Sequence, residues 1–315
     1  MRITLLSLCF TLLTWCSVLG QINVKPANFT TPIQISRDVL GSPLKLTITP
    51  RLAGAVHSIQ WKGQEFIDSH DHGRQMQSAS NFDLGTDFHG ETFNPTEAGS
   101  RNDGAGPAST SKLLRLSYTK DQLQTTTRMA FWLAPDQNSS GKPAKNKTLL
   151  SNHLLKKRVT LGFKQWSNVI RYEATFTTPA GEFHRYAQFE AVTGYMPEHF
   201  NTFWGVNLRQ EELVSLTDGP GEQRHPVILS TKDKSLAMGV YAPQQPSKGY
   251  ENAGYGRFRF PAAKVTKWNS VFRIQDKNGV PAGDYYYDNY VVVGDLRTVT
   301  NTILNLALFF RDNAQ

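Results

Sequence analysis

Side chains that could do acid–base or binding chemistry are concentrated in residues 65–103. Buried polar groups need partners, so a stretch this polar predicts the lining of a cleft and not a core element. If the chain is extended there, His70, His72 and Arg74 lie on one face. We predict that His70 and Arg74 bind the substrate, the arginine through a carboxylate or sugar hydroxyls, and that His72 acts as acid or base near neutral pH. The alternative is a turn that Asp71 caps, with Arg74 paired to a structural carboxylate.

A carboxylate on a stiff loop follows in the same stretch. The turn at Asn94 and the proline after it constrain the backbone around Glu97. A carboxylate held in this way suits a general base, so we predict that Glu97 is catalytic. Gln77, Asn94 and Arg101 are predicted to bind the sugar. An ordinary loop salt bridge between Glu97 and Arg101 is the alternative.

Aromatic and polar residues alternate in a third segment, residues 194–204. Sugar faces stack on aromatic rings while their hydroxyls take hydrogen bonds, so Tyr195, Asn201 and Trp204 are predicted to bind a glycan. His199 is predicted to be a further acid or base. The alternative is that the aromatic residues of this segment are core residues under a loop.

Several other kinds of chemistry find no support in the sequence. It contains no HExxH, GxSxG, P-loop or dinucleotide-binding fingerprint. His70 and His72 with Glu91 or Asp87 offer only a His-x-His spacing, which lacks a fixed third metal ligand. We therefore predict neither a metal nor a cofactor.

Residues 1–20 have the basic start, apolar centre and small-residue end of a secretory signal peptide. We predict cleavage before Gln21, a secreted or periplasmic protein, and no stable membrane insertion after cleavage; an uncleaved anchor is the alternative. Both cysteines, Cys9 and Cys16, lie in this leader. Residues 21–315 must then fold by burial alone, and they are predicted to form one domain.

The chain is basic, with a formal net charge of +8. Such an excess attracts anionic partners. The basic residues are scattered, apart from the run at 156–158, and a leader points away from nucleic acid. We therefore predict a glycan partner, acidic glycans included, and no nucleic acid; a solvated basic surface without a partner is the alternative.

Alternating β-branched and aromatic residues predict strands through most of the chain. Only the segment after Asp295 has helical spacing, and Asp295 is predicted to be the N-cap of that helix. The predicted strands are Leu44–Ile48, Ala55–Trp61, Leu113–Tyr118, Thr125–Leu133, Leu154–Phe163, Val169–Thr177, Phe183–Thr193, Pro226–Ser230, Ala237–Ala242, Val265–Gln275 and Tyr285–Gly294. Residues 250–259 are predicted to be a glycine-punctuated loop. This pattern indicates an all-β fold, a large antiparallel two-layer β-sandwich with a C-terminal helix.

A family resemblance rests on five segments. They are W-x-G-x-E-F-I-D at 61–68, D-H-G-R-Q-M-Q-S-A at 71–79, N-P-T-E-A-G at 94–99, T-G-Y-M-P at 193–197 and Y-V-V-V-G-D-L at 290–296. On these segments the chain resembles secreted bacterial proteins of the galactose-mutarotase-like β-sandwich type. The resemblance implies a concave sugar-binding face, in a shape shared by sugar mutarotases, some glycoside hydrolases and domains of polysaccharide lyases. Mutarotases of this shape use a His and a Glu as acid and base. By residue type, the resemblance implies these roles for His72 or His199 and for Glu97.

Together these features predict a secreted carbohydrate-active enzyme that cleaves a polysaccharide or oligosaccharide. A glycoside hydrolase needs two carboxylates, for which Glu97 with Asp103, Glu91 or Glu198 would serve.

A polysaccharide lyase is the other form of this prediction. It needs a cation beside a uronate and a base for the C5 proton, for which Arg74 with His72 or Tyr195 would serve. The alternatives are a non-catalytic glycan-binding protein and a sugar mutarotase or epimerase. The residues do not decide among these reactions.

Overall fold

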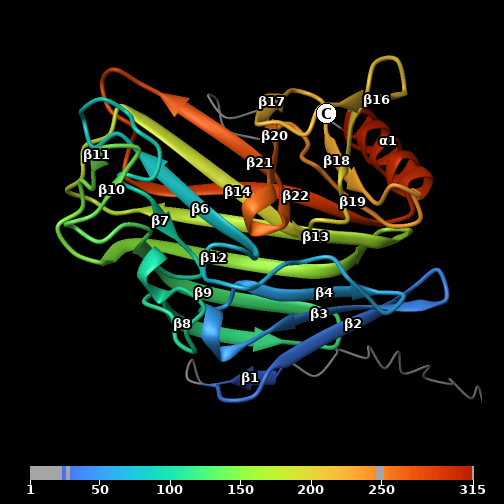
Figure 1. Cartoon of the computed structure of the whole chain (residues 1–315), viewed down its shortest axis with the longest axis horizontal. Helices are drawn as coiled ribbons and strands as arrows, with labels where there is room; N and C mark the ends of the chain where they lie inside the picture. Colours follow the sequence, from blue (N-terminus) through green and yellow to red (C-terminus); the bar gives the residue numbers. More distant parts are fainter. Residues whose placement is uncertain (1–22, 26–28, 246–251, 314–315) are drawn as a thin grey trace, which may run out of the picture.

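The computed structural model describes residues 23–25, 29–245 and 252–313 of the chain. Its strands pair antiparallel and form one continuous sheet that is folded into two layers (Figure 1). The predicted all-β sandwich with a C-terminal helix is confirmed. The predicted leader, residues 1–20, lies outside the described residues.

The first layer is a long antiparallel sheet whose order follows from the strand pairings. From one edge to the other it consists of β1 (Asn23–Lys25), β8 (Lys112–Tyr118), β9 (Gln122–Phe131), β12 (Leu150–Phe163), β13 (Trp166–Thr178), β22 (Gly283–Gly294), β19 (Ala237–Tyr241), β18 (Val227–Ser230), β15 (Thr202–Asn207) and β16 (Glu212–Leu216).

The second layer is also antiparallel. It consists of β2 (Ile33–Val39), β3 (Ser42–Ile48), β4 (Val56–Trp61), β6 (Met76–Phe82), β14 (Tyr186–Pro197), β21 (Val265–Gln275), β20 (Gly254–Phe260) and β17 (Gly221–Gln223), with β5 (Gln64–Glu65) beside β4. The short strand β7 (Pro95–Thr96) pairs with both β6 and β9 and so joins the layers. A separate hairpin consists of β10 (Asn138–Ser139) and β11 (Lys142–Pro143).

The apolar core lies between the two layers. Phe189 of β14 faces Phe176 of β13 and Tyr287 of β22, with ring centroids 5.1 and 5.4 Å apart. All three side chains are buried, which contributes about 1.5–3 kcal/mol each for side chains of this size. The alternation of each strand therefore separates residues that face this core from residues that face outward.

The helix α1 (Leu296–Asp312) covers a second, smaller apolar cluster and packs on β18, β19 and β22 (Figure 1). The Asp295 carboxylate accepts the backbone N–H of Thr298 at 2.7 Å, so the predicted N-cap is confirmed. Three shorter 3-10 turns occur at Pro50–Leu52, Arg101–Asp103 and Pro261–Ala263. Within the described ranges no helix has the length and apolar character to cross a bilayer.

Several strands differ from the prediction, and β2, β6, β15 and β16 were not among the predicted strands. β14 begins at Tyr186 and not at Phe183, since the backbone N–H of Arg185 donates to the Asp83 carboxylate at 2.9 Å before the strand starts. Residues 254–260 form β20 and not a loop. There Gly256 has no side chain, so its N–H reaches the Asn269 side chain at 2.9 Å.

The N-cap gives a first test of the fold. Replacing Asp295 by Ala leaves the N–H of Thr298 without its acceptor, so we expect a loss of about 1 kcal/mol in the free energy of unfolding. Urea denaturation measures this loss. Asp312→Ala, at the exposed last turn of the same helix, serves as the control and should change stability by less than about 0.5 kcal/mol. Equal effects of the two substitutions would contradict a capping role.

Candidate functional site

A cavity of about 310 Å³ lies on the outward face of β6, β14 and β21. These three strands are neighbours in the second layer although they come from distant parts of the chain (Figure 1). Their inward side chains, including Met76, Phe189 and Phe272, belong to the core, so the alternate residues line the cavity. The lining consists of Asp71, Gly73, Arg74, Gln77, Ala79, Asn81, Gly90, Glu91, Asn94, Thr96, Trp132, Gln188, Glu190, Thr193, Tyr195 and Lys267.

A β-bulge in β14 decides which of its residues reach this cavity. The register of β14 against both neighbours shifts after Glu190, where one extra residue is inserted. Before the bulge the even-numbered residues Gln188 and Glu190 face outward; after it the odd-numbered residues Thr193 and Tyr195 do. The bulge therefore brings polar residues from both halves of the strand into one cavity.

The ammonium group of Lys267 joins two functional groups of β14. Its Nζ donates to Glu190 Oε2 at 3.0 Å, and Asn269 Nδ2 donates to the same oxygen at 3.3 Å. Lys267 also makes a hydrogen bond with Tyr195, and it lies over the Tyr195 ring at 5.2 Å. The side chains of Glu190 and Lys267 are only 14% and 12% exposed, so water screens this pair weakly.

The pKa values of these groups are shifted. Burial by itself raises the pKa of Glu190, but the charge and hydrogen bond of Lys267 outweigh it and lower the pKa from 4.5. Burial lowers the pKa of Lys267, but Glu190 and Tyr195 more than compensate and raise it. Burial also raises the pKa of Tyr195 above 10.0, and Lys267 offsets this only in part. At neutral pH the cavity therefore presents a carboxylate, an ammonium and a protonated phenol.

An aromatic side and a fixed arginine complete the cavity. The ring of Trp132 lies against Gly73, where a Cβ atom would come within 2.8 Å of the indole. Gly73 thus leaves the space that this ring needs, and Trp132 offers an apolar face on which a sugar can stack. Arg74 is held by Asp71 at 3.0 Å and by the Ala263 carbonyl at 3.1 Å. Its place on the cavity wall is therefore fixed before any ligand binds.

Four predicted binding residues line the cavity: Arg74, Gln77, Asn94 and Tyr195. The amide of Gln77 accepts the N–H of Ala98 at 3.0 Å, and Asn94 Nδ2 donates to a carbonyl of β6 at 2.6 Å. These two amides therefore hold the loop after β6 in place as well as lining the cavity. Arg74 is paired with Asp71, which is the arrangement of the alternative prediction, a turn in which this arginine pairs with a structural carboxylate.

Glu97 does not lie on the cavity, so its predicted position there is wrong. Its side chain is fully buried and forms an ion pair with Lys157, which is also fully buried. Glu97 Oε2 accepts the N–H of Ser78 at 3.1 Å and the hydroxyl of Tyr172 at 3.5 Å, and Lys157 donates to the Gly54 carbonyl at 2.7 Å. The loop after β7 therefore directs the carboxylate inward between the layers.

His72 is a structural residue and does not face the cavity as predicted. It is 1% exposed. Its Nδ1 lies 2.7 Å from the Gly104 carbonyl and its Nε2 lies 3.0 Å from the Arg51 carbonyl. Both ring nitrogens are therefore engaged by backbone oxygens, which leaves no free nitrogen for a substrate.

The other predicted residues lie elsewhere on the molecule. His70, Arg101, His199 and Asn201 are exposed, and none of them belongs to the cavity lining. Trp204 donates its indole N–H to a serine hydroxyl of β18 at 3.0 Å and packs on the cluster under the helix. Residues 198–204 therefore do not line the cavity, because the chain turns away from it after β14.

The residues with the strongest chemistry in the cavity were not predicted from the sequence. Glu190 and Lys267 lie in strands with alternating polar residues, which look the same as strands whose outer face meets solvent. Trp132 follows β9 directly and resembles a core residue. The outward-facing residues of β14 and β21 are polar at Gln188–Glu190 and Lys267–Asn269, which is a weak indication of a site in the sequence. Only the pairing of the two strands shows that these polar residues adjoin.

The sequence matches no protein-family model, and no curated protein matches it significantly. Among solved structures the chain is similar to a proposed aldose 1-epimerase from Klebsiella pneumoniae subsp. pneumoniae, with 10% identity, a TM-score of 0.47, and 93% of this chain and 96% of that chain covered. A galactose mutarotase-like protein from Lactobacillus casei matches with 10% identity and a TM-score of 0.42, over 84% of this chain and all of the other.

A protein in the glycosyl hydrolase family 38 from Enterococcus faecalis is a third similar structure. It matches with 10% identity and a TM-score of 0.46, over 90% of this chain and 40% of its own length. At this identity the likenesses concern the path of the chain and not the residues of the cavity. The cavity itself defines a polar site with an aromatic side, built on one layer of a large β-sandwich.

The buried ion pair of Glu97 and Lys157 gives a test of the corrected assignment. Lys157→Met leaves a buried carboxylate without its partner, so we expect the free energy of unfolding to fall by about 3–5 kcal/mol. The double variant Glu97→Gln, Lys157→Met removes both charges and should recover most of this loss. Urea denaturation measures both effects.

Lys156→Met is the matched control, because the neighbouring Lys156 side chain is 53% exposed. Its effect should stay within about 0.5 kcal/mol. Similar stabilities of the Lys156 and Lys157 variants would show that the buried pair contributes nothing.

Proposed function

We propose that the chain is a carbohydrate-active enzyme that interconverts the anomers of a neutral sugar, or of the reducing-end sugar of a glycan, in this cavity. The observation that supports the proposal is the joining of Glu190 and Tyr195 by one ammonium group, that of Lys267. A carboxylate base and a phenol acid are thereby held on one cavity wall. Anomer interconversion requires such a pair, because one proton leaves the anomeric hydroxyl as another reaches the ring oxygen.

The reaction proceeds in two steps, ring opening and ring closure, each with two proton transfers. Glu190 takes the proton of the anomeric hydroxyl while Tyr195 donates its phenolic proton to the ring oxygen, and the bond between that oxygen and the anomeric carbon breaks. The open aldehyde rotates, and the reverse transfers close the ring on the other face of the carbonyl. Lys267 stabilises the phenolate that Tyr195 forms in the first step, because its ammonium already contacts that side chain.

The remaining lining residues hold the sugar. Trp132 provides a face for the apolar side of the ring, while Asn94, Asn81 and Gln188 offer amide groups to the hydroxyls. The backbone of Glu91 adopts a left-handed conformation, with φ of 67°. Its N–H donates to Asn81 at 3.0 Å. The edge of the cavity is thereby fixed before the sugar binds.

The charges of the lining favour a neutral sugar over an acidic one. The lining contains three carboxylates, on Asp71, Glu91 and Glu190, but only two cations, Arg74 and Lys267. Both of these cations are paired with carboxylates of the same lining. A uronate would therefore meet a net negative cavity, which disfavours the lyase chemistry that needs a free cation beside the substrate.

Hydrolysis of a glycosidic bond is the second candidate, and the observation that favours it is Glu91 on the same cavity. A hydrolase needs a protonated carboxylic acid opposite a carboxylate. The lowered pKa of Glu190 suits the carboxylate role, so Glu91 would have to be the acid. Glu91 is exposed and accepts the Ser139 hydroxyl at 2.7 Å, whereas Glu190 and Tyr195 are both joined to Lys267, so the cavity supports hydrolysis less well than anomer interconversion.

Glu190→Gln tests the proposed base. The amide cannot accept the proton, so we expect the rate of anomer interconversion to fall by about 100-fold or more. The reaction is followed by exchange NMR of the anomeric protons of neutral reducing sugars, with the uncatalysed rate subtracted. Glu212→Gln, at an exposed site on β16, is the control and should keep full activity.

The same protein preparations distinguish the competing functions. Incubation with neutral polysaccharides that releases reducing ends, without faster anomer exchange, would replace the proposal by hydrolysis. New absorbance of unsaturated uronates would replace it by lyase action. Sugar binding without any of these signals would show a non-catalytic glycan-binding protein.

The pH dependence follows from the directions of the two pKa shifts. Glu190 must be ionised to act as a base, and its pKa lies below 4.5, so the rate should fall only when the pH drops below that value. Tyr195 must be protonated to act as an acid, and its pKa lies above 10.0, so the rate should persist to that pH. A plateau across this range is expected; a bell-shaped profile centred near pH 6.5 would instead indicate a histidine.

A further inference from the structure

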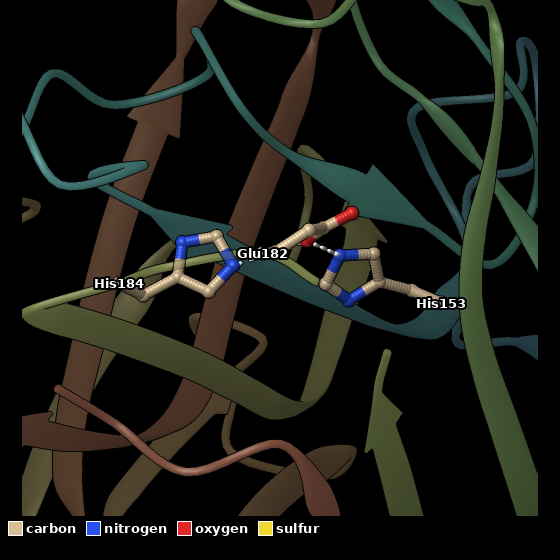
Figure 2. A group of neighbouring side chains, drawn as sticks. All are labelled: His153, Glu182 and His184. Atoms are coloured by element: carbon tan, nitrogen blue, oxygen red, sulfur yellow. Dashed lines mark hydrogen bonds and ion pairs between the residues drawn. The ribbon is translucent and has the colours of Figure 1, made fainter. Parts of the chain in front are cut away.

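Two histidines and one glutamate converge at one end of the sandwich, apart from the cavity. Figure 2 shows the rings of His153 and His184 on either side of the Glu182 carboxylate. Both Nε2 atoms point at the same oxygen, Glu182 Oε2, at 2.8 Å from His153 and 3.0 Å from His184. All three groups therefore present ligand atoms within 4.8 Å of one another.

The elements that carry the three residues explain this convergence. His153 belongs to the inward row of β12. Glu182 and His184 lie two residues apart in the segment between β13 and β14, on either side of the exposed Phe183 in the sequence. Residues 153 and 182 are separated by 29 positions, so no sequence motif indicates that they meet.

Aromatic packing fixes both imidazole rings. The ring of Phe82 lies 4.9 Å from His153 and 4.5 Å from His184, and Phe93 lies 6.0 and 5.7 Å from them. Both histidines are buried. The two nitrogens are therefore aimed at one point without freedom to turn away, which is what a metal site requires of its ligands.

We propose that His153, Glu182 and His184 form a binding site for a divalent transition-metal ion of the zinc type. Two imidazole nitrogens and one carboxylate are a ligand set that such ions take. Ligands at about 2.0–2.1 Å from a tetrahedral zinc ion lie about 3.3 Å apart, so separations of 2.8 and 3.0 Å need to widen only slightly. When the ion is bound, the Nε2 atoms coordinate it and each imidazole carries its proton on Nδ1. Glu182 then coordinates the ion and loses its two hydrogen bonds to the imidazoles.

The site is open on one side only. The Glu182 side chain is 20% exposed, whereas those of His153 and His184 are 2% and 0% exposed. An ion enters past the carboxylate and keeps its remaining position for water on that side. Nδ1 of His184 is buried without a hydrogen-bond partner among the described residues. Since metal-bound histidines usually donate from this nitrogen, the affinity should be moderate.

The ion would act on stability and not on the sugar reaction. Phe82, which packs on both histidines, faces inward from β6, whereas its neighbour Asn81 faces the sugar cavity. The site thus lies on the other side of that strand. Its ligands come from β12 and from the segment before β14, so an ion links the two layers and should stabilise the folded chain.

Zinc and cobalt titrations of the full chain test the site after treatment with a chelator. We expect one Zn²⁺ ion per chain by calorimetry, visible Co²⁺ absorption bands, and a rise in Tm with added Zn²⁺. Glu182→Gln should weaken Zn²⁺ binding by about 100-fold or more and remove the rise in Tm. His225→Gln is the control, because His225 is an exposed histidine outside the cluster, and it should bind as the unaltered chain does.

The variants are chosen so that misfolding cannot imitate the result. Gln at position 182 has nearly the same shape as Glu and accepts a hydrogen bond, so this variant should keep the far-ultraviolet circular dichroism of the unaltered chain. His184→Asn provides a second substitution with the same expected loss of binding. The proposal is overturned if the unaltered chain binds no Zn²⁺, or if both folded variants bind it as tightly as the unaltered chain.

Discussion

The buried ion pair between Glu97 and Lys157 is the interaction on which the arrangement of the two layers depends. Glu97 directly follows β7, the short strand that pairs with β6 in one layer and β9 in the other. Lys157 lies in the inward row of β12. With no water at either group, each charge relies on the other, and the N–H of Ser78 binds the same carboxylate. Because Ser78 is part of β6, this pair also fixes the strand that forms one wall of the cavity.

The fold was largely predictable because alternation and helical spacing are local properties of the sequence. The long strands and the helix with its Asp295 cap follow from such patterns. The site was predictable only in part: Arg74 and Tyr195 were predicted to bind the same ligand, and both line the cavity. Glu190 and Lys267 were not expected, because their chemistry arises from the pairing of β14 with β21, and strand register across a large sheet is not encoded by spacing.

The wrong assignments have a common physical cause. His72 and Glu97 were selected because polar, titratable residues close together suggest an open cleft. In the structure each has found partners inside the molecule, namely backbone carbonyls for His72 and a lysine for Glu97. The inward row of β12 also indicates such buried partners, since His153 and Lys157 alternate with the apolar residues Leu155, Val159 and Leu161. A charged residue in an otherwise apolar inward row indicates that it has a buried partner. The sequence of the row does not identify that partner.

The bulge in β14 divides this strand into two parts with separate registers. Glu190 belongs to the part before the insertion and Tyr195 to the part after it. Glu190 and Tyr195 are five positions apart, an odd separation that would place them on opposite faces of a regular strand. The inserted residue adds the one step that brings both side chains to the cavity. A deletion of that residue would therefore leave both in the cavity, whereas one further residue inserted between them, without a second bulge, would turn Tyr195 toward the core.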